Sequence, residues 1–242
     1  GEMHGDSALS PEIRERLQNE DCHVLIGEVW EDASHKFVNS EFRTYMAGDN
    51  LTGTMNYPVR NFIISLLQAN NETEEVAALN DLEKLVENYP KAFLENCLNN
   101  IGTHDTARIK TVLGGDEQLV ALTFGLLFSI PGVPCIYYGD EAGLEGDKDP
   151  DNRRTYPWGH EDLDLLAWTK ALTRLRTAHD ALQTGRFIPL YADGDVFAFA
   201  RVIEGGKDVF GKPAEDGFFI IAMNRNPSAL RTISIYTDGL AY

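Results

Sequence analysis

Four short apolar runs, interleaved with helical sequence, constrain the fold of this chain more than any other feature. They lie at residues 23–30, at about 52–56, at 98–102 and at 134–138. Such runs predict strands buried on both faces, which occur mainly in parallel sheets covered by helices. Helices are expected to begin at Pro58 and at Glu117, and a short helix is expected at Ser10 and Pro11. Residues 32–50 are expected to form a long loop. The alternation predicts a parallel α/β fold.

The pattern changes beyond Gly185. A helix expected at about 162–179 is followed by three alternating runs, at 196–202, 218–223 and 230–235, between loops rich in Gly and Pro. Alternation with a period of two predicts an antiparallel β module. We therefore expect two domains, an α/β domain at residues 1–184 and a C-terminal β domain at residues 185–242.

The charge balance argues against two classes of partner. The chain has 38 acidic and 21 basic residues, a net charge of -17. Binding a phosphate backbone requires clustered Lys and Arg, so no nucleic-acid partner is expected. No apolar run approaches the length of a membrane span, so no membrane partner is expected either. The balance favours a neutral or cationic ligand, although solvated surface charge alone would give the same total.

The three cysteines, Cys22, Cys97 and Cys135, each lie in or beside an apolar run. An odd number in such surroundings favours buried free thiols over a disulfide framework. Free thiols favour a cytoplasmic location. Secretion stays open, because a signal sequence could precede Gly1 in a longer protein.

Polar side chains gather where the predicted strands end. Glu28 and Trp30 end the first strand, His104 and Asp105 follow the third, and an acidic and basic loop at 147–154 follows the fourth. Because the carboxyl ends of parallel strands meet at one edge of a sheet, the three clusters can form one site. Glycoside hydrolysis requires two such carboxylates, one to protonate the departing oxygen and one to stabilise the charged sugar ring.

Each cluster also has a plainer explanation. Glu28 could simply meet solvent at a strand end, as most glutamates do, and Asp105 could cap the following helix. A metal site of Glu28, His104 and Asp105 is disfavoured, because the chain lacks closely spaced His or Cys ligands. An unrelated α/β hydrolase using Glu28 and His104 is a further alternative. The sequence contains no Gly-x-Ser-x-Gly elbow and no phosphate-binding loop.

Five motifs, in order along the chain, resemble the α-amylase family and especially its neopullulanase and cyclomaltodextrinase branch. They are Gly-Glu-Val-Trp-Glu-Asp-Ala-Ser at 27–34, Met-Asn-Tyr-Pro at 55–58, Gly-Thr-His-Asp-Thr-Ala-Arg at 102–108, Gly-Val-Pro-Cys-Ile-Tyr-Tyr-Gly-Asp-Glu at 132–141, and Asp-Pro-Asp-Asn-Arg-Arg at 149–154 with Pro157 and Trp158. The resemblance implies a (β/α)8 barrel followed by an antiparallel β-sandwich. It also implies retaining hydrolysis of α-1,4-glucosidic bonds in α-glucan oligosaccharides such as maltodextrins and cyclodextrins, or in pullulan.

The same resemblance implies roles for seven residues. Glu28 matches the general acid/base, and Asp105 matches the second carboxylate, which holds sugar hydroxyls and stabilises the transition state. The substrate-binding matches are His104 on the same glucose unit, Trp30 and Tyr57 as stacking aromatics, and Asp149 with Arg153 on the non-reducing side. Val29 and Trp30 are expected to shield the Glu28 carboxyl from water and favour its protonated form.

One part of the family pattern has no match in the sequence. The family's nucleophile is an aspartate in a Gly-x-Arg-x-Asp strand upstream of the glutamate strand. Only 27 residues precede Glu28, and Asp6 among them has no arginine two positions earlier. The four strands would then be the fifth to eighth of the barrel. We therefore expect the C-terminal half of an amylase-type domain, inactive alone because retaining hydrolysis needs both carboxylates.

A half barrel leaves sheet edges without partners and leaves Glu28 more open to water than a closed barrel would. Because exposed edges pair readily, self-association through them is expected. Calcium is expected only in a longer parent protein, since the family's ion site draws on the other half of the barrel, and no other cofactor is expected. The alternative function is that of a non-catalytic, amylase-like domain that binds sugar or a protein. The presence of both carboxylates, Glu28 and Asp105, argues against this alternative.

Overall fold

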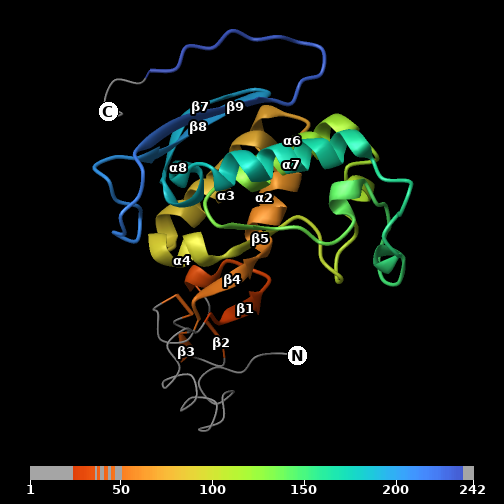
Figure 1. Cartoon of the computed structure of the whole chain (residues 1–242), viewed down its shortest axis with the longest axis horizontal. Helices are drawn as coiled ribbons and strands as arrows, with labels where there is room; N and C mark the ends of the chain where they lie inside the picture. Colours follow the sequence, from red (N-terminus) through yellow and green to blue (C-terminus); the bar gives the residue numbers. More distant parts are fainter. Residues whose placement is uncertain (1–23, 36, 39–40, 43–44, 47–50, 237–242) are drawn as a thin grey trace.

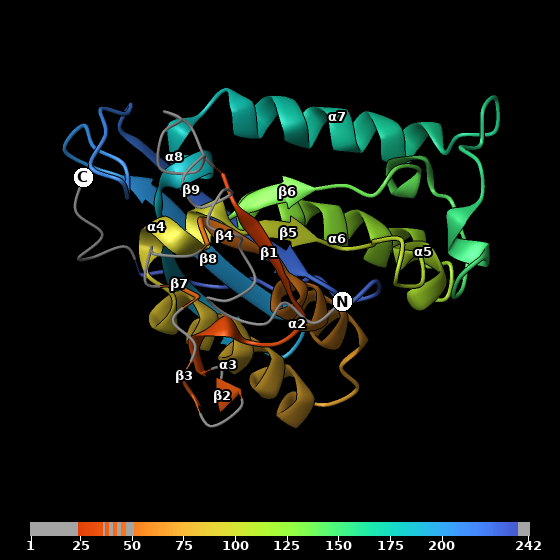
Figure 2. The same cartoon turned by 90° about the horizontal axis from the view of Figure 1, so that it is seen from below.

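The computed structural model describes residues 24–35, 37–38, 41–42, 45–46 and 51–236 (Figure 1). One sheet has four strands in the order β1-β4-β5-β6, and its strands β1 and β4 lie toward one end of the molecule (Figure 1). The strands are β1 (Ile26–Val29), β4 (Gly53–Asn56), β5 (Leu98–Asn100) and β6 (Val133–Cys135). All neighbouring strands are parallel, so their carboxyl ends meet at one edge (Figure 2). The prediction of a parallel α/β fold is confirmed.

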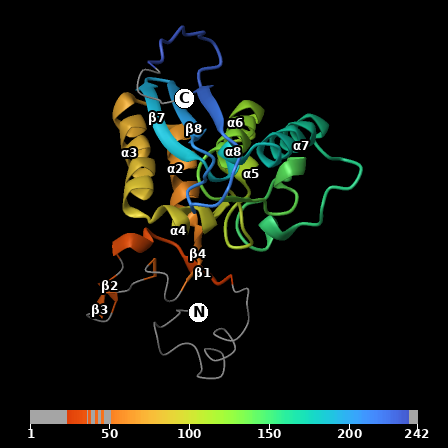
Figure 3. The same cartoon turned by 60° about the vertical axis from the view of Figure 1, so that its left-hand side comes forward.

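Helices follow the strands, among them those expected at Pro58, at Glu117 and at about 162–179. They are α2 (Tyr57–Gln68), α3 (Glu72–Asn88), α4 (Lys91–Asn96), α5 (Ile109–Val112), α6 (Glu117–Ser129), α7 (Leu163–Thr177) and α8 (Asp180–Thr184). Pro58 lies in the first turn of α2, where its missing N–H costs no hydrogen bond. In Figure 3, α3 and α7 lie on opposite sides of the molecule with α2 and α6 between them. No helix in the described part of the chain is long and apolar enough to cross a membrane.

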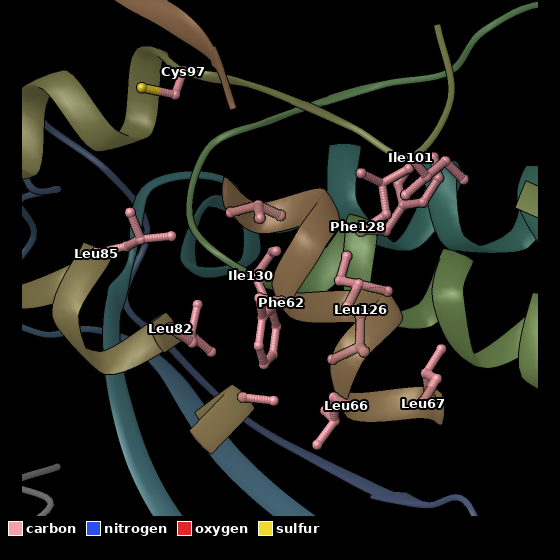
Figure 4. Close-up of a cluster of buried hydrophobic side chains, with 14 of the residues drawn as sticks. Phe62, Leu66, Leu67, Leu82, Leu85, Cys97, Ile101, Leu126, Phe128 and Ile130 are labelled. Carbon is pink, nitrogen blue, oxygen red and sulfur yellow. The ribbon is translucent and has the colours of Figure 1, made fainter. Parts of the chain in front are cut away.

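The core forms where the faces of α2, α3 and α6 converge (Figure 4). Phe62 and Leu66 of α2, Leu82 of α3 and Leu126 of α6 are all at most 5% exposed. Burying each such side chain stabilises the fold by about 1.5–3 kcal/mol. Cys97 is buried beside this cluster and, like the half-buried Cys135, is a free thiol, as expected for these two.

A second, antiparallel sheet follows in the order β7-β8-β9, formed by β7 (Arg186–Asp193), β8 (Val196–Ile203) and β9 (Gly217–Asn224). The prediction of an antiparallel β module at the C-terminal end is confirmed, whereas the described residues supply one of the two sheets that a sandwich needs. Phe197 and Phe199 of β8 pack into the core that the helices form, so one face of this sheet is covered by helices.

Three local predictions also differ from the structure. Residues 230–235 form no strand, and Leu230 is fully exposed there. The segment expected to be a loop contains a small hairpin, β2 (Phe37–Val38) paired with β3 (Glu41–Phe42). β6 covers only the start of its predicted run and ends at Cys135. The helix predicted at Ser10, together with Cys22, lies outside the described residues.

A buried ion pair attaches the antiparallel sheet to the rest of the molecule. Arg201 of β8 places Nη2 3.0 Å from Oε1 of Glu95 in α4, and both side chains are buried. Glu95 also accepts the backbone N–H of Gly132, just before β6, at 2.9 Å. Burial raises the pKa of Glu95, and the Arg201 cation opposes that rise. The pair therefore links β8, α4 and the start of β6.

Candidate active site

Glu28 lies near the end of β1, at the edge where the parallel strands finish. Its side chain is exposed, Val29 is half-buried, and Trp30 is 46% exposed. The predicted shielding of the carboxyl group from water is therefore wrong for this structure. β1 is an edge strand of the sheet, which agrees with the expected openness of a half barrel.

Tyr57 joins the first strand of the site to the third. It begins α2 directly after β4, and its hydroxyl lies 3.4 Å from Glu28 Oε1 and 3.4 Å from Thr103 Oγ1. Thr103 Oγ1 in turn accepts the backbone N–H of Asp105 at 3.2 Å. Burial raises the pKa of Tyr57, which keeps its hydroxyl protonated and able to donate. A continuous chain of contacts thus runs from Glu28 to Asp105.

The aromatic surface at this edge is the ring of Trp30. The Trp30 and Tyr57 rings are stacked, with centroids 3.9 Å apart and planes 10° apart. Tyr57 is only 2% exposed, so its ring is covered on the Trp30 side and contributes chiefly its hydroxyl group to the site. The outer face of Trp30 remains for a ligand, and flat aromatic faces pack well against apolar ring surfaces.

Asp105 lies at the centre of a group of charged side chains. Its Oδ2 is 3.1 Å from His104 Nε2, and its Oδ1 is 3.6 Å from Arg153 Nη2. Arg153 Nη2 is also 3.1 Å from Asp149 Oδ2. All four side chains are at least 38% exposed. Ion pairs this exposed add little stability, so the polar atoms are available to a ligand.

Asp105 does not serve as a helix cap. The next helix, α5, begins at Ile109, and its N-cap residue is Arg108, without a capping side-chain hydrogen bond. The plainer explanation for Asp105 is therefore excluded. All seven residues singled out from the sequence belong to one set of contacts, in which Thr103 is the additional link.

A buried set of residues, to which sequence reasoning assigned no role, supports this edge. Asn152 donates through Nδ2 to the carbonyl oxygens of His104, at 2.9 Å, and Thr106, at 2.8 Å. Arg108 donates through Nε to the Asn152 carbonyl oxygen at 2.9 Å, and its Nη1 lies 3.1 Å from Asp140 Oδ1. Asn152, Arg108 and Asp140 are at most 1% exposed. An arginine inside a strand-end motif was the signal that could have indicated a buried ion pair.

Asp140 lies in an environment that strongly favours its neutral form. Burial raises its pKa to about 7, and the hydrogen bond and charge of Arg108 limit that rise. Gly102 makes room for the carboxyl group, because a Cβ at that position would come within 2.3 Å of Asp140 Oδ2. The two motifs at 102–108 and 132–141 are therefore fitted to one another by close packing.

A metal site was one alternative for these residues. Within the ranges that the structure describes, no group of three or more His, Cys, Asp or Glu side chains is arranged to hold a metal ion. Glu28, His104 and Asp105 therefore do not form such a group.

The parallel sheet carries two carboxylates, a histidine, an arginine and an exposed tryptophan at its carboxyl edge, which is where barrel folds place their sites and the kind of side-chain set that glycoside hydrolases use. The chain belongs to the alpha-amylase family, since residues 4–174 match the family description "Alpha amylase, catalytic domain". The resemblance found in the sequence motifs is thereby confirmed.

Relatives of this chain include an amylopullulanase of Thermoanaerobacter thermohydrosulfuricus, 36% identical over 90% of this chain and 16% of the relative. A cyclomaltodextrinase of Bacillus sp is 35% identical over 78% of this chain and 32% of the relative. Among solved structures, a debranching enzyme from Nostoc punctiforme superposes with a TM-score of 0.75 at 29% identity, covering 93% of this chain and 46% of that one. The chain thus spans less than half the length of each.

Proposed function

We propose that this chain is the C-terminal half of the catalytic barrel of a retaining α-glucan hydrolase, with β1, β4, β5 and β6 as the fifth to eighth strands. The observation that carries the proposal is the contact chain from Glu28 through Tyr57 and Thr103 to Asp105. It holds two carboxylates from non-adjacent strands of one sheet in a single network, as glycoside hydrolysis requires. The length of the solved relative, of which this chain covers 46%, supports the half-barrel assignment.

Glu28 is the general acid/base in this proposal. It protonates the glycosidic oxygen as the bond to C1 breaks, while an aspartate from the preceding half of the barrel bonds to C1. The Glu28 carboxylate then takes a proton from water, whose oxygen bonds to C1 and releases the aspartate. Asp105 and His104 hold hydroxyls of the reacting sugar. The negative charge of Asp105 also stabilises the positive charge that develops on the ring.

The remaining residues bind the rest of the glucan. Trp30 presents its exposed face to a sugar ring, and Tyr57 fixes the Glu28 carboxyl through its hydroxyl group. Asp149 and Arg153 bind sugar on the non-reducing side. We propose α-1,4-linked glucans as substrates, in the range from maltodextrins and cyclodextrins to pullulan. The names of the amylopullulanase and cyclomaltodextrinase relatives support this range.

The incomplete barrel also suggests self-association. In the described residues, β1 and β6 are the outer strands of the parallel sheet, and each has one edge without a partner strand. Val24, before β1, is 70% exposed, and Val133, on β6, is 42% exposed. Apolar edge strands pair readily with other chains. We propose that copies of this chain associate through these edges.

The catalytic assignment is tested by hydrolysis of maltotriose. We expect this chain alone to release no glucose, because the proposal assigns the nucleophile to the preceding half of the barrel. In the longer protein that completes the barrel, Glu28→Gln should lower the rate at least about 100-fold, since general acid catalysis contributes roughly 10² to 10⁴.

The matched control is Glu83→Gln, which changes an exposed glutamate on α3, a helix that contributes no residue to the contact chain, and should keep the full rate. A Glu28→Gln protein that kept more than about a hundredth of the rate would refute the assignment. If the longer protein binds maltotriose and hydrolyses none, the alternative of a non-catalytic sugar-binding domain is the correct one.

A further inference from the structure

Asn152 occupies an unusual place among the buried residues of the site. It lies in the single turn η3 (Asp151–Arg153), in the loop that also contributes Asp149, and its side chain is 0% exposed. Its Nδ2 donates one hydrogen bond to the His104 carbonyl oxygen and another to the Thr106 carbonyl oxygen. These are the carbonyl groups on either side of Asp105. Asn152 thus forms hydrogen bonds to the backbone of the residues before and after Asp105.

Chemistry fixes the orientation of the Asn152 amide. Both partners are carbonyl oxygens, which only accept, so the group that faces them must carry two protons. Asn152 is itself held in place, because its backbone carbonyl oxygen accepts a hydrogen bond from Arg108 Nε at 2.9 Å. Arg108 is fully buried, and its Nη1 lies 3.1 Å from Asp140 Oδ1. The hydrogen bonds beside Asp105 are therefore anchored to the interior of the fold.

The next residue along the chain completes the connection. Arg153 places Nη2 near both the Asp105 and the Asp149 carboxylates. One short turn thus holds Asp105 twice, through the backbone by Asn152 and through the side chain by Arg153. A shift of this turn would move the Asp105 carboxylate and the Arg153 guanidinium together.

We propose that Asn152 is a positioning residue that fixes the Asp105 carboxylate and the Arg153 guanidinium relative to one another, in the arrangement that binds the sugar. It touches no substrate and acts through the two carbonyl groups beside Asp105. The ordering of the Asp105 loop follows from the geometry alone. The claim that this order serves sugar binding rests on the proposed function.

Native-state hydrogen exchange of this chain tests the ordering. Asn152→Leu keeps the size of the side chain and removes both donors. The backbone amide protons of Asp105, Thr106 and Arg108 should then lose about 10- to 100-fold in protection, since each buried hydrogen bond contributes on the order of 1 kcal/mol. The amide protons of β8, in the centre of the antiparallel sheet, report global stability in the same sample. Equal losses at both places would overturn the proposal.

Two further variants separate positioning from general destabilisation. Thr123→Val removes a buried side-chain hydrogen bond to a carbonyl oxygen within α6, and it should leave the ratio of loop to β8 protection unchanged. Asn152→Asp keeps the shape, and only its protonated form can donate to one of the two carbonyl groups. Its loop protection relative to the unchanged protein should therefore be higher at pH 5 than at pH 8. Asn152→Leu should show no such dependence, and a flat profile for Asn152→Asp would contradict the proposal.

Titration with maltoheptaose tests the link to the proposed function. If the unchanged chain binds maltoheptaose, Asn152→Leu should weaken binding about tenfold or more, whereas Thr123→Val should not change it. Equal binding by Asn152→Leu would overturn the positioning of Asp105 for sugar. If the longer protein that completes the barrel also shows no binding while the exchange result holds, the sugar-binding part of the proposed function fails and the ordering role stands.

Discussion

Asp140 is a buried carboxyl group whose protonation couples the stability of the protein to pH. It is 1% exposed, and its Oδ2 has no hydrogen-bond partner among the described residues. Burial raises its pKa to about 7, from a value near 4 in an unfolded chain. Between these two pH values the folded protein holds a proton that the unfolded chain releases. The contribution of Asp140 to stability is therefore fully present below about pH 4 and is lost as the pH rises through 7.

Asp140→Asn should flatten this pH dependence. An amide resembles the protonated carboxyl group and can still accept from Arg108, so the variant should be nearly as stable as the unchanged protein at pH 5. From pH 5 to pH 8 the unchanged protein should lose more of its free energy of unfolding than the variant does. Urea unfolding at both pH values measures the difference. Parallel losses in the two proteins would show that Asp140 does not titrate in this range.

The residues of the site differ in how far the sequence reveals them. Glu28 and Asp105 could be found because each follows a strand-like run, and parallel strands bring such positions to one edge. Asn152 and Thr103 could not, since they act through backbone groups that only the folded chain brings within reach. The exposure of Glu28 was misjudged from its neighbours, because side chains adjacent in a strand point to opposite faces.

At the scale of single elements, α6 shows how one cap supports a buried helix. Its central residues are buried almost all round, so a shift of its start would disturb packing on several sides. Asp116 precedes the helix, and its Oδ1 accepts the backbone N–H groups of Gln118 at 2.9 Å and Leu119 at 3.0 Å. The carboxylate also lies at the positive end of the helix dipole.

Asp116→Ala should lower the free energy of unfolding by about 1 kcal/mol, because it leaves two N–H groups without their acceptor. Guanidinium unfolding should show a lower midpoint with an unchanged slope. Asp81→Ala is the control, since Asp81 is exposed within α3 and forms an exposed ion pair with Lys84 on the same helix. If both variants have the same midpoint as the unchanged protein, the cap contributes nothing measurable.

The elements with a clear period were predictable, and those without one were not. β7 escaped prediction because Pro189 interrupts it, which an edge strand tolerates since its outer N–H groups need no partner. The run at 230–235 has the alternation of a strand, yet Arg231 instead bonds to Asp193 as the chain passes β7. An alternating pattern of apolar residues indicates which side chains a strand would bury, but it does not show that a partner strand is available to pair with it.

On the scale of the whole molecule, the open parallel sheet should make association measurable. Light scattering after size exclusion should give a mass above the 27.0 kDa of one chain, rising with concentration. Val133→Lys puts a charge on the open edge at β6 and should lower that mass, whereas Val76→Lys on the outer face of α3 should not. A clean monomer at high concentration would refute association through the edges.

The ion pair between Arg201 and Glu95 limits how this protein can exchange parts during evolution. The predicted domain boundary near residue 184 suggests that residues 185–242 could be exchanged as a unit for another domain. Arg201 lies beyond that boundary and Glu95 before it, and removing one partner of a buried pair costs about 3–5 kcal/mol. A replacement module must therefore bring a cation to the position of Arg201, or Glu95 must change in the same step. The two parts are expected to be inherited together.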